Sequence, residues 1–411
     1  MATLYPFRAL RPSASKAPSV AAVPYDVVTT DEARALAEGN PLSFLRVSRP
    51  ELELPPGSDP YSDAVYARAA ENFSALRQSA LIVDDEPSVY LYRLKMGSHT
   101  QTGVAACFSL DEYDRDVIKK HERTRRDKED DRTRHMLALA AQTGPVFMTY
   151  RALPEVDTLV EGATIAPPVV DFDAIDGVQH SIWRMGGADR DKLVSAFAWI
   201  PALYIADGHH RAASAARART EIAKRRGDTD GTIAEDADYR TMLAVAFPDN
   251  QVQILPYNRI VKDLGGLTPD ELLRAVREAF EVETGPATPA HRGEIAMYLG
   301  GEWYTLTPRA KAASDDPIGS LDVSVLQERL LASILKIADV RTDKRIDFVG
   351  GARGTRELER LVDSGKAAVA FSLFPVSVGD LMTVSDAGEI MPPKSTWFEP
   401  KLRDGLLIHM I

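Results

Sequence analysis

The distribution of hydrophobic and polar residues predicts short strands and helices over most of the chain. The apolar run from Leu203 to Ala206 has the length of a buried strand. The alanine-rich segment 212–226 follows it and contains no glycine or proline. Because alanine and arginine are good helix formers, we expect a strand that leads into a helix beginning near His209.

Antiparallel pairing is predicted earlier in the chain. Residues 88–96 and 100–110 alternate between apolar and polar side chains, and the short segment between them suits a hairpin turn. Residues 61–80 have helical periodicity. Together these patterns favour an α/β or α+β fold, with a mixed sheet and packed helices.

The organisation changes after Leu267. The segment from Thr268 to Glu271 opens a helix with a capping box, and strand, helix and strand patterns follow up to residue 375. We therefore expect a domain boundary near residue 265. Residues 1–265 would form a catalytic region, and residues 266–411 a second α+β region.

Five polar residues stand where the predicted strand at 203–206 meets its helix: Asp207, Gly208, His209, His210 and Arg211. We expect Asp207 to cap the helix and Gly208 to allow a sharp turn. The free N–H groups of a helix N-terminus attract anions, and the guanidinium of Arg211 suits phosphate. The histidines can exchange protons or bind a metal. The alternative is a capped helix whose polar side chains are only solvated.

Two earlier segments carry further candidate chemistry. Asp26 lies among apolar residues, either as a turn residue or as a carboxylate placed in a cleft. In the charged run 111–132, His121 and Arg125 are four residues apart and would share a helix face. The alternative for this run is a solvated face with salt bridges, which is the usual role of mixed charges.

A third segment lies near the C-terminus. Lys394, Ser395 and Thr396 offer one cation and two hydroxyl groups, which suit phosphate oxygens. Trp397 and Phe398 can anchor this segment in a hydrophobic core. The alternative is a structural loop before the last strand.

Composition and charge limit the classes of function. The chain has 411 residues and a formal net charge of −11, which counts against a nucleic-acid-binding protein. Its single cysteine, Cys107, excludes a disulfide framework and a cysteine-rich zinc site. No apolar run approaches the ~20 residues of a membrane helix, and the N-terminus has no signal-peptide core. We expect a cytoplasmic protein with no nucleic-acid or membrane partner.

Four motifs, in this order, resemble the signature of the domain-of-unknown-function family ten-fifteen. They are PYDVV at 24–28, HERTR at 121–125 with Asp131 and Arg132, IADGHHR at 205–211, and PPKSTWFEPK at 392–401. The Asp207–Arg211 box is also similar to the phosphate-binding box of the ParB/sulfiredoxin-like superfamily, in the form found in free-serine kinases. This resemblance implies a ParB/sulfiredoxin-like mixed-sheet core, elaborated by a second C-terminal region.

The resemblance also implies a reaction. In free-serine kinases the box holds the donor phosphates, and an acidic residue from an earlier loop accepts the proton of the serine hydroxyl. Members of family ten-fifteen are linked to serine phosphorylation with inorganic pyrophosphate. We therefore expect a phosphotransferase that converts L-serine to O-phosphoserine, with pyrophosphate, ADP, ATP or CTP as donor.

Residue roles follow from the same resemblance. The residues expected to bind the donor are Asp207, Gly208, His209, His210, Arg211, Thr124, Arg125, Arg132, Lys394, Ser395 and Thr396. The expected catalytic residues are Asp26, Glu122 and His121, with the proton acceptor open between Asp26 and Glu122. A Mg²⁺ ion would bridge the phosphates and Asp207. The tail at 392–401 would return to the active site.

Two other functions stay open. One is a ParB-like nucleotide-binding switch that turns over no small molecule and changes its oligomeric state. The other is a metal-dependent hydrolase with His209, His210 and an acid as ligands, although adjacent residues do not share a helix face. For the kinase, the expected partner is L-serine, and a homo-oligomer remains open.

Overall fold

The computed structural model describes residues 1–55, 57–228, 237–309 and 316–411 and divides into two compact units. The first unit is Met1–Val252 with Pro400–Ile411, and the second is Gln253–Glu399. The division thus falls before residue 265, because β14 (Tyr257–Val261) pairs with β18 (Ile346–Gly350) and β19 (Val369–Leu373) in the sheet of the second unit.

A nine-stranded mixed sheet forms the centre of the first unit, with the order β6-β11-β8-β12-β5-β4-β10-β9 and β1 paired to β5. β11 is parallel to β6 and antiparallel to β8, so the predicted mixed α/β class is confirmed. The predicted hairpin is β4 and β5. The strands are β1 Leu4–Tyr5, β4 Val89–Met96, β5 His99–Ser109, β6 Ile118–Lys119, β8 Val146–Tyr150, β9 Val170–Asp173, β10 Val178–Met185, β11 Leu203–Asp207 and β12 Thr241–Pro248.

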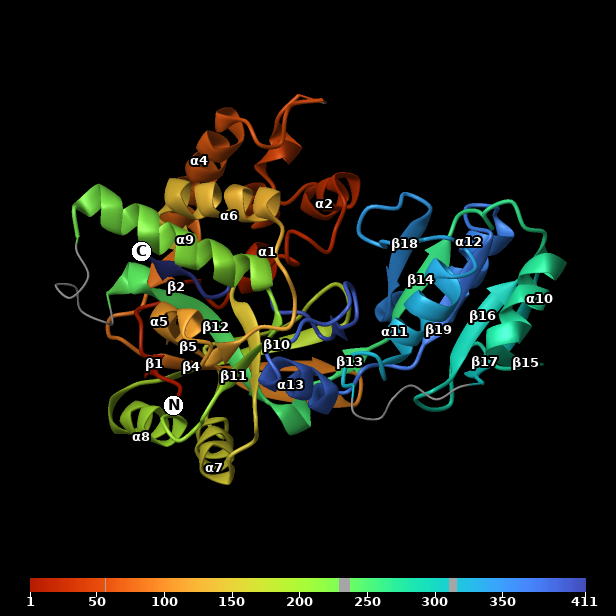
Figure 1. Ribbon diagram of the computed structural model, residues 1–411. Coiled ribbons are helices and arrows are strands. Elements are labelled where there is room, and N and C mark those ends of the chain that lie inside the picture. The colour runs from red at the N-terminus through yellow and green to blue at the C-terminus, as the bar shows by residue number, and fades with distance from the viewer. Residues whose placement is uncertain (56, 229–236, 310–315) are drawn as a thin grey trace. The chain divides into compact units, whose positions relative to one another are not determined.

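Helices lie on both sides of this sheet. Figure 1 shows α6 and α9 on one side, and α7 and α8 on the other. Ala212, Ala215 and Ala218 of α9 are buried in the core, where their small side chains let the helix approach closely. The helices are α1 Ala17–Val20, α2 Thr30–Ala37, α3 Leu45–Ser48, α4 Asp63–Ser79, α5 Leu110–Asp114, α6 Arg126–Leu139, α7 Pro154–Ala163, α8 Gly187–Phe197 and α9 His209–Arg226.

The C-terminal segment 400–411 completes the first unit. Its strand β21 (His409–Met410) pairs with β7 (Ala141–Gln142), next to the short pair of β2 (Leu10–Pro12) and β3 (Leu81–Val83). Backbone bridges also join Ile408 to Leu10 and Asp404 to Ala22. These backbone bonds hold the segment 400–411 within the first unit.

The second unit has its own six-stranded sheet, in the order β15-β17-β16-β19-β14-β18. The capping box predicted at Thr268 and Glu271 opens α10 and is confirmed. The remaining elements are α10 Pro269–Ala279, α11 Asp322–Leu326, α12 Gly354–Asp363, α13 Val378–Asp386, β13 Ile254–Leu255, β15 Phe280–Thr284, β16 Ile295–Leu299, β17 Glu302–Pro308 and β20 Trp397–Phe398.

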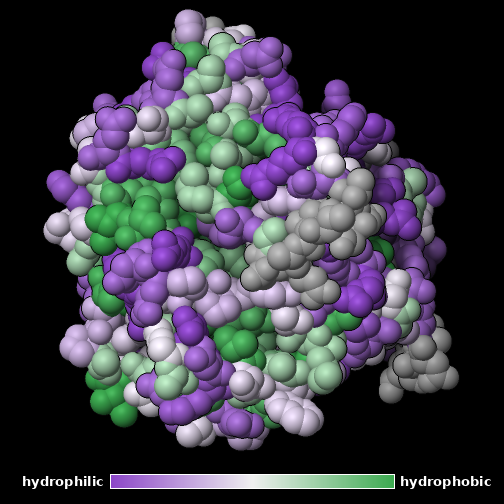
Figure 2. Space-filling model, turned by 90° about the vertical axis from the view of Figure 1, so that its left-hand side faces the viewer, coloured by the Kyte–Doolittle hydropathy of each residue, from purple (hydrophilic) through white to green (hydrophobic). Residues whose placement is uncertain are grey.

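Hydrophilic residues cover much of the face shown in Figure 2 and surround smaller hydrophobic patches. Within the described ranges, every helix is too short or too polar to span a lipid bilayer.

Candidate functional site

The predicted junction of strand and helix is present in the first unit. β11 ends at Asp207 and α9 begins at His209, with Gly208 between them as the N-cap. Gly208 has a φ of 96°, a left-handed conformation that costs glycine little. A Cβ at this position would lie 2.9 Å from Arg211 Nε. The junction therefore requires glycine for its backbone conformation and for the close approach of Arg211.

Asp207 does not cap the helix, so that prediction is wrong. Gly208 occupies the N-cap, and no side chain makes a cap hydrogen bond. Asp207 Oδ2 instead accepts a hydrogen bond from Lys401 Nζ at 3.1 Å and lies 3.7 Å from an Arg211 terminal nitrogen. Burial would raise the pKa of Asp207, but these two cations lower it well below its usual range. The carboxylate stays ionised between them.

The two histidines of the box contact the segment that precedes α6. The His121 backbone N–H donates to His209 Nε2 at 3.4 Å, and the Arg125 N–H donates to His210 Nε2 at 3.0 Å. A neutral imidazole that accepts a hydrogen bond at Nε2 carries its proton on Nδ1. His209 Nδ1 lies 3.7 Å from Glu122 Oε2. Burial holds the pKa of His209 well below its ordinary value, so its ring is neutral at pH 7.

His121 lies against His209, with 4.5 Å between ring centroids and nearly perpendicular planes. It is buried, and neither ring nitrogen makes a hydrogen bond of ordinary geometry to the residues that the structure describes. Burial lowers the pKa of His121 to about 4, against opposing effects of the Ile205 backbone and the Asp207 charge. A buried ring whose nitrogens make no hydrogen bond of ordinary geometry is costly, and a ligand could supply such a bond.

Arg211 lies inside the protein rather than in open solvent. One terminal nitrogen donates to the Pro145 carbonyl, and Nε has no hydrogen-bond partner among the described residues. Burial would lower the pKa of Arg211, but the carboxylates of Asp207, Asp26 and Asp404 raise it. Arg211 therefore brings a stable positive charge to the base of the box.

Asp26 is exposed, in a turn that two arginines hold in place. The guanidinium carbon of Arg132 lies 4.1 Å from the centroid of the Tyr25 ring. Arg49 donates to the Tyr25 and Val28 carbonyls, at 3.0 and 2.6 Å. The charge of Asp26 acts on Arg211, so the first motif and the box are electrostatically linked. No spacing in the sequence pointed to Arg49.

The helical spacing proposed for His121 and Arg125 is wrong, because α6 begins only at Arg126. The Arg125 side chain is 70% exposed and pairs with Asp127 at 2.8 Å. The Thr124 hydroxyl donates to Glu129. Arg132 does lie in α6, where it pairs with Asp131 at 2.7 Å. The segment 121–125 is thus a loop that orients the box histidines through its backbone.

The residues expected from the tail motif belong to two different units. Lys394, Ser395 and Thr396 are in the second unit, whereas Lys401 is in the first and contacts Asp207. Lys394 Nζ lies 5.5 Å from the centroid of the Tyr257 ring. Lys401 is the last residue of the motif, and sequence reasoning gave it no role.

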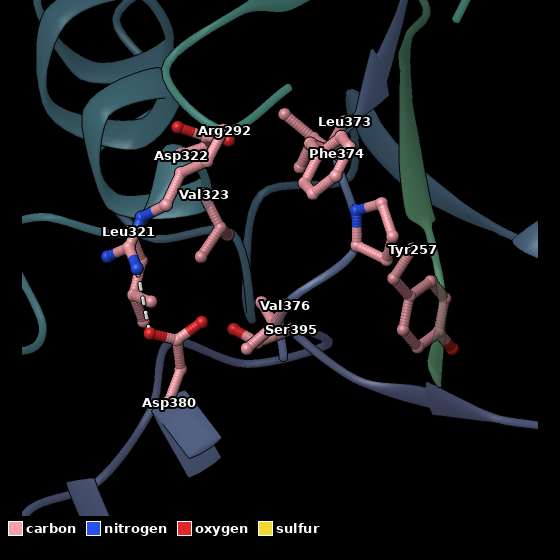
Figure 3. A pocket seen from close by; sticks show the side chains of 11 residues that line it. Tyr257, Arg292, Leu321, Asp322, Val323, Leu373, Phe374, Val376, Asp380 and Ser395 are labelled. Atoms are coloured by element: carbon pink, nitrogen blue, oxygen red, sulfur yellow. Dashed lines mark hydrogen bonds and ion pairs between the residues drawn. The ribbon is translucent and has the colours of Figure 1, made fainter. Parts of the chain in front are cut away.

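Ser395 lines a pocket that lies wholly within the second unit (Figure 3). Its Oγ donates to the Pro392 carbonyl, and an ion pair of 2.8 Å joins Arg292 and Asp380 on one side of the pocket. Burial raises the pKa of Asp322 to about 6. The other lining residues are Tyr257, Leu321, Val323, Leu373, Phe374, Pro375 and Val376.

The donor set around Asp207 does not fit a preformed Mg²⁺ site. Its nearest partners are the cations Lys401 and Arg211, which compete with a metal ion for the carboxylate. In the described part of the chain, no three His, Cys, Asp or Glu side chains are grouped to hold a metal. His209 and His210 each use one ring nitrogen on a backbone N–H, as described above. The described residues therefore do not form the set of His209, His210 and a carboxylate that a metal hydrolase was expected to use.

Comparisons with known proteins identify a family but no established activity. The family model described as "Protein of unknown function (DUF1015)" matches residues 4–324, and no curated protein matches the sequence. Among solved structures, the chain is similar to a free serine kinase in complex with AMP, at 14% identity over 74% of this chain and 92% of that chain, with a TM-score of 0.36. It is also similar to a conserved hypothetical protein from Pyrococcus furiosus, at 14% identity, 74% and 95% coverage and a TM-score of 0.37. A third is C-terminally truncated SbnI from Staphylococcus aureus, at 13% identity, 74% and 87% coverage and a TM-score of 0.39. Because the family model spans most of the chain, this protein belongs to the DUF1015 family.

Proposed function

We propose that this protein transfers a phosphoryl group to a small hydroxyl compound, most simply L-serine, from pyrophosphate or a nucleoside di- or triphosphate. The observation that carries the proposal is the start of α9. Among the described residues it has no side-chain cap, and it adjoins buried nitrogens of His121 and Arg211 that make no hydrogen bond of ordinary geometry. Such a set of donors suits an anion.

The donor phosphates would lie against the first turn of α9. The N–H groups at a helix N-terminus and the helix dipole favour negative charge there, and Lys401 and Arg211 add two cations close by. Phosphoryl transfer depends mainly on positioning and on neutralising charge, which this site can supply. Thr124, Arg125 and Arg132 would complete the cationic wall. For Lys394, Ser395 and Thr396 the proposal rests on their motif alone.

The acceptor hydroxyl must lose its proton, and Asp26 and Glu122 remain the candidates to accept it. Asp26 is exposed and its charge acts on Arg211. Glu122 is 39% exposed and faces His209. The residues around Asp207 do not fit the oxygen ligand set of Mg²⁺, because its partners are the cations Lys401 and Arg211.

The test is a screen of donors against L-serine. Purified protein would be incubated with L-serine and, in turn, pyrophosphate, ADP, ATP and CTP, and phosphoserine measured by mass spectrometry. Product with one donor would support the proposal. Asp26→Asn and Glu122→Gln would then separate the two candidates, since only loss of the true proton acceptor should lower the rate strongly, by about 100-fold or more.

Two outcomes would contradict the proposal. Absence of phosphoserine with every donor would contradict phosphoryl transfer to L-serine. Nucleotide binding without product, accompanied by a change in mass by light scattering, would favour the nucleotide-binding switch instead.

A further inference from the structure

The segment that brings Lys401 to Asp207 is anchored by the next charged residue, Arg403. The Arg403 side chain is only 4% exposed, although a charged group is normally kept in water. Its Nε donates to His180 Nε2 at 3.1 Å, and a terminal nitrogen donates to the Asp176 carboxylate. All of these residues belong to the first unit. Arg403 therefore ties the returning segment to strand β10 and to the turn that precedes it.

His180 is a fixed point in the sheet. It is completely buried, its ring stacks on Phe172 of β9 with 5.3 Å between ring centroids, and its Nδ1 lies 2.9 Å from the Tyr92 hydroxyl oxygen of β4. Burial and the charge of Arg403 hold the pKa of His180 well below its ordinary value, so the ring is neutral at pH 7. Because Nε2 accepts from Arg403, the neutral ring donates from Nδ1 to Tyr92. The acceptor for Arg403 is therefore held in one orientation.

Hydrophobic side chains already bury this segment without Arg403. Leu402 is 3% exposed, and Leu406 is completely buried. A buried charged network often adds no more stability than an apolar side chain of the same size, whereas its hydrogen bonds fix a direction. What Arg403 adds is therefore the position of the backbone. Two residues span at most about 7 Å of chain, so a displaced Arg403 would move Lys401 with it.

The position of the backbone matters most for Lys401. Its Nζ donates to Asp207 Oδ2 at 3.1 Å, and its side chain is 12% exposed. A lysine side chain is a flexible stem with a single charge at its end, so it does not fix its own geometry as a planar arginine can. The contact between Lys401 and Asp207 therefore depends on how the chain beside it is held.

We infer that Arg403 and His180 are positioning residues that hold Lys401 at the phosphate-binding box. The inference rests on the proposed function, in which Lys401 is one of two cations beside the donor phosphates. Arg403 acts through Lys401, whose ammonium group neutralises charge on the donor. The effect of Arg403 on donor binding should therefore disappear when Lys401 is absent.

The experiment is a double-mutant cycle on the binding of pyrophosphate, or of the nucleotide that the screen identifies as donor, measured by calorimetry at pH 7. Lys401→Met should weaken binding by about 10- to 100-fold, the usual range for a hydrogen bond to a charged group. Arg403→Lys keeps the charge but cannot make both directed bonds, and it should weaken binding by about 10-fold. In the Lys401→Met background, the same Arg403→Lys change should weaken binding by less than about twofold.

A purely structural role for Arg403 would give a different result. Arg403→Lys would then weaken binding by the same factor with and without Lys401, and this result, or no weakening in either background, would overturn the positioning role while the proposed function stands. His180→Leu removes the acceptor of the Arg403 Nε–H and should give the same pattern as Arg403→Lys. If circular dichroism shows that Arg403→Lys does not fold, the His180→Leu cycle decides.

Arg184→Lys is the control on the same strand, β10. Arg184 Nε donates to Ser88 Oγ at 2.9 Å, and a terminal nitrogen pairs with Asp85, so its partners lie outside the segment 400–411. This change should leave donor binding within about twofold of its starting value in both backgrounds. A tenfold loss for Arg184→Lys would mean that any disturbance of β10 reaches the box, which would overturn the specific role of Arg403.

If the wild type binds neither pyrophosphate nor any nucleotide, the proposed function fails, and the positioning role is judged on the contact between Lys401 and Asp207 alone. Urea unfolding would then compare the loss of stability caused by Lys401→Met in the wild type and in Arg403→Lys. The loss should be clearly smaller in Arg403→Lys, because Lys401 is no longer held against Asp207 in that variant. Equal losses would overturn the positioning role as well.

Discussion

At the scale of single residues, the box depends on a balance between cations and carboxylates. Asp207 lies between Lys401 and Arg211. The charges of Asp26 and Asp404 also raise the pKa of Arg211. Because all of these groups except Asp26 are partly or fully buried, each buried charge is stable only while its neighbours stay in place. Single substitutions should therefore affect both stability and phosphate binding.

Gly208→Ala tests the need for glycine at the junction. The left-handed backbone should cost about 1–2 kcal/mol for alanine, and the new methyl group would also displace Arg211. We expect a larger loss of unfolding free energy in urea than for Gly227→Ala, together with loss of donor binding. Gly227, at the end of the same helix, has a φ of 73° but open space around it, so it isolates the backbone cost. Equal losses for the two variants would contradict this account.

Lys401→Met removes one cation from Asp207. Breaking this partly buried pair should cost about 1–3 kcal/mol at pH 7, and pyrophosphate binding by calorimetry should weaken. The pKa of Asp207 is lowered in the folded state, so the stability it contributes is present at neutral pH and is lost as pH falls through that lowered value. The difference between wild type and variant should therefore shrink in acid.

Lys192→Met is the control for that substitution. Lys192 pairs with Asp189 on α8, and both side chains are more than 60% exposed. An exposed pair of this kind contributes little, so we expect a change within about 0.5 kcal/mol. If Lys192→Met lowered the free energy of unfolding as much as Lys401→Met does, the contact between Lys401 and Asp207 would contribute no more than an exposed ion pair.

At the scale of elements, the buried face of α9 beyond the box consists of small residues, mostly alanine. Ala212, Ala215 and Ala218 are at most 2% exposed, and α6 packs along the same helix. Larger side chains on this face would push α9 away from the sheet. The helix composition therefore sets the position of its first turn relative to Asp207 and Lys401.

Ala215→Leu tests this packing. The added atoms have no free space in the core, and overpacking of this kind typically costs about 1–3 kcal/mol, measured by urea unfolding. Ala213→Leu, on the half-buried side of the same helix, should cost clearly less. The reverse order would mean that α9 is not held by its alanine face.

Local patterns predicted several elements correctly. The strand and helix around the box, the hairpin of β4 and β5 and the capping box of α10 all depend on residues close together in sequence. The His121–Arg125 spacing failed because the same charges suit either a loop or a helix, and only the start of α6 at Arg126 distinguishes them. The cap at Asp207 failed because Lys401 offers its carboxylate a better partner than the helix N–H groups.

Other parts of the site could not be predicted from local pattern. The bond from Lys401 to Asp207 joins residues 194 positions apart, and the bridge from Asp404 to Ala22 spans nearly the whole chain. Periodicity carries no information about such pairs. The position of the domain boundary could not be predicted for the same reason. β14 is assigned to its unit only by pairing with strands about 90 and 110 residues later.

At the scale of the whole molecule, the chain leaves the first unit at residue 252 and returns to it at residue 400. The returning segment buries Leu406, Leu407 and Ile408 completely. Burial of three such side chains is worth roughly 1.5–3 kcal/mol each, which is comparable with the total stability of many domains. A chain that ends at Glu399 should therefore lack a cooperatively folded first unit, measured by circular dichroism and limited proteolysis. Removal of half-buried Ile411 alone should be tolerated. A stably folded first unit in the chain that ends at Glu399 would contradict the expectation.

The return of the chain also has a consequence for biosynthesis. A ribosome releases the N-terminus first, and many N-terminal domains fold while the rest is still being made. Here the loop of Asp26, the strand β11 and the helix α9 emerge before Lys401, which follows Asp207 by 194 positions, and before Asp404. The charged site can therefore be completed only after residues 400–411 have been made, so a nascent chain that stops before Lys401 never carries an assembled box.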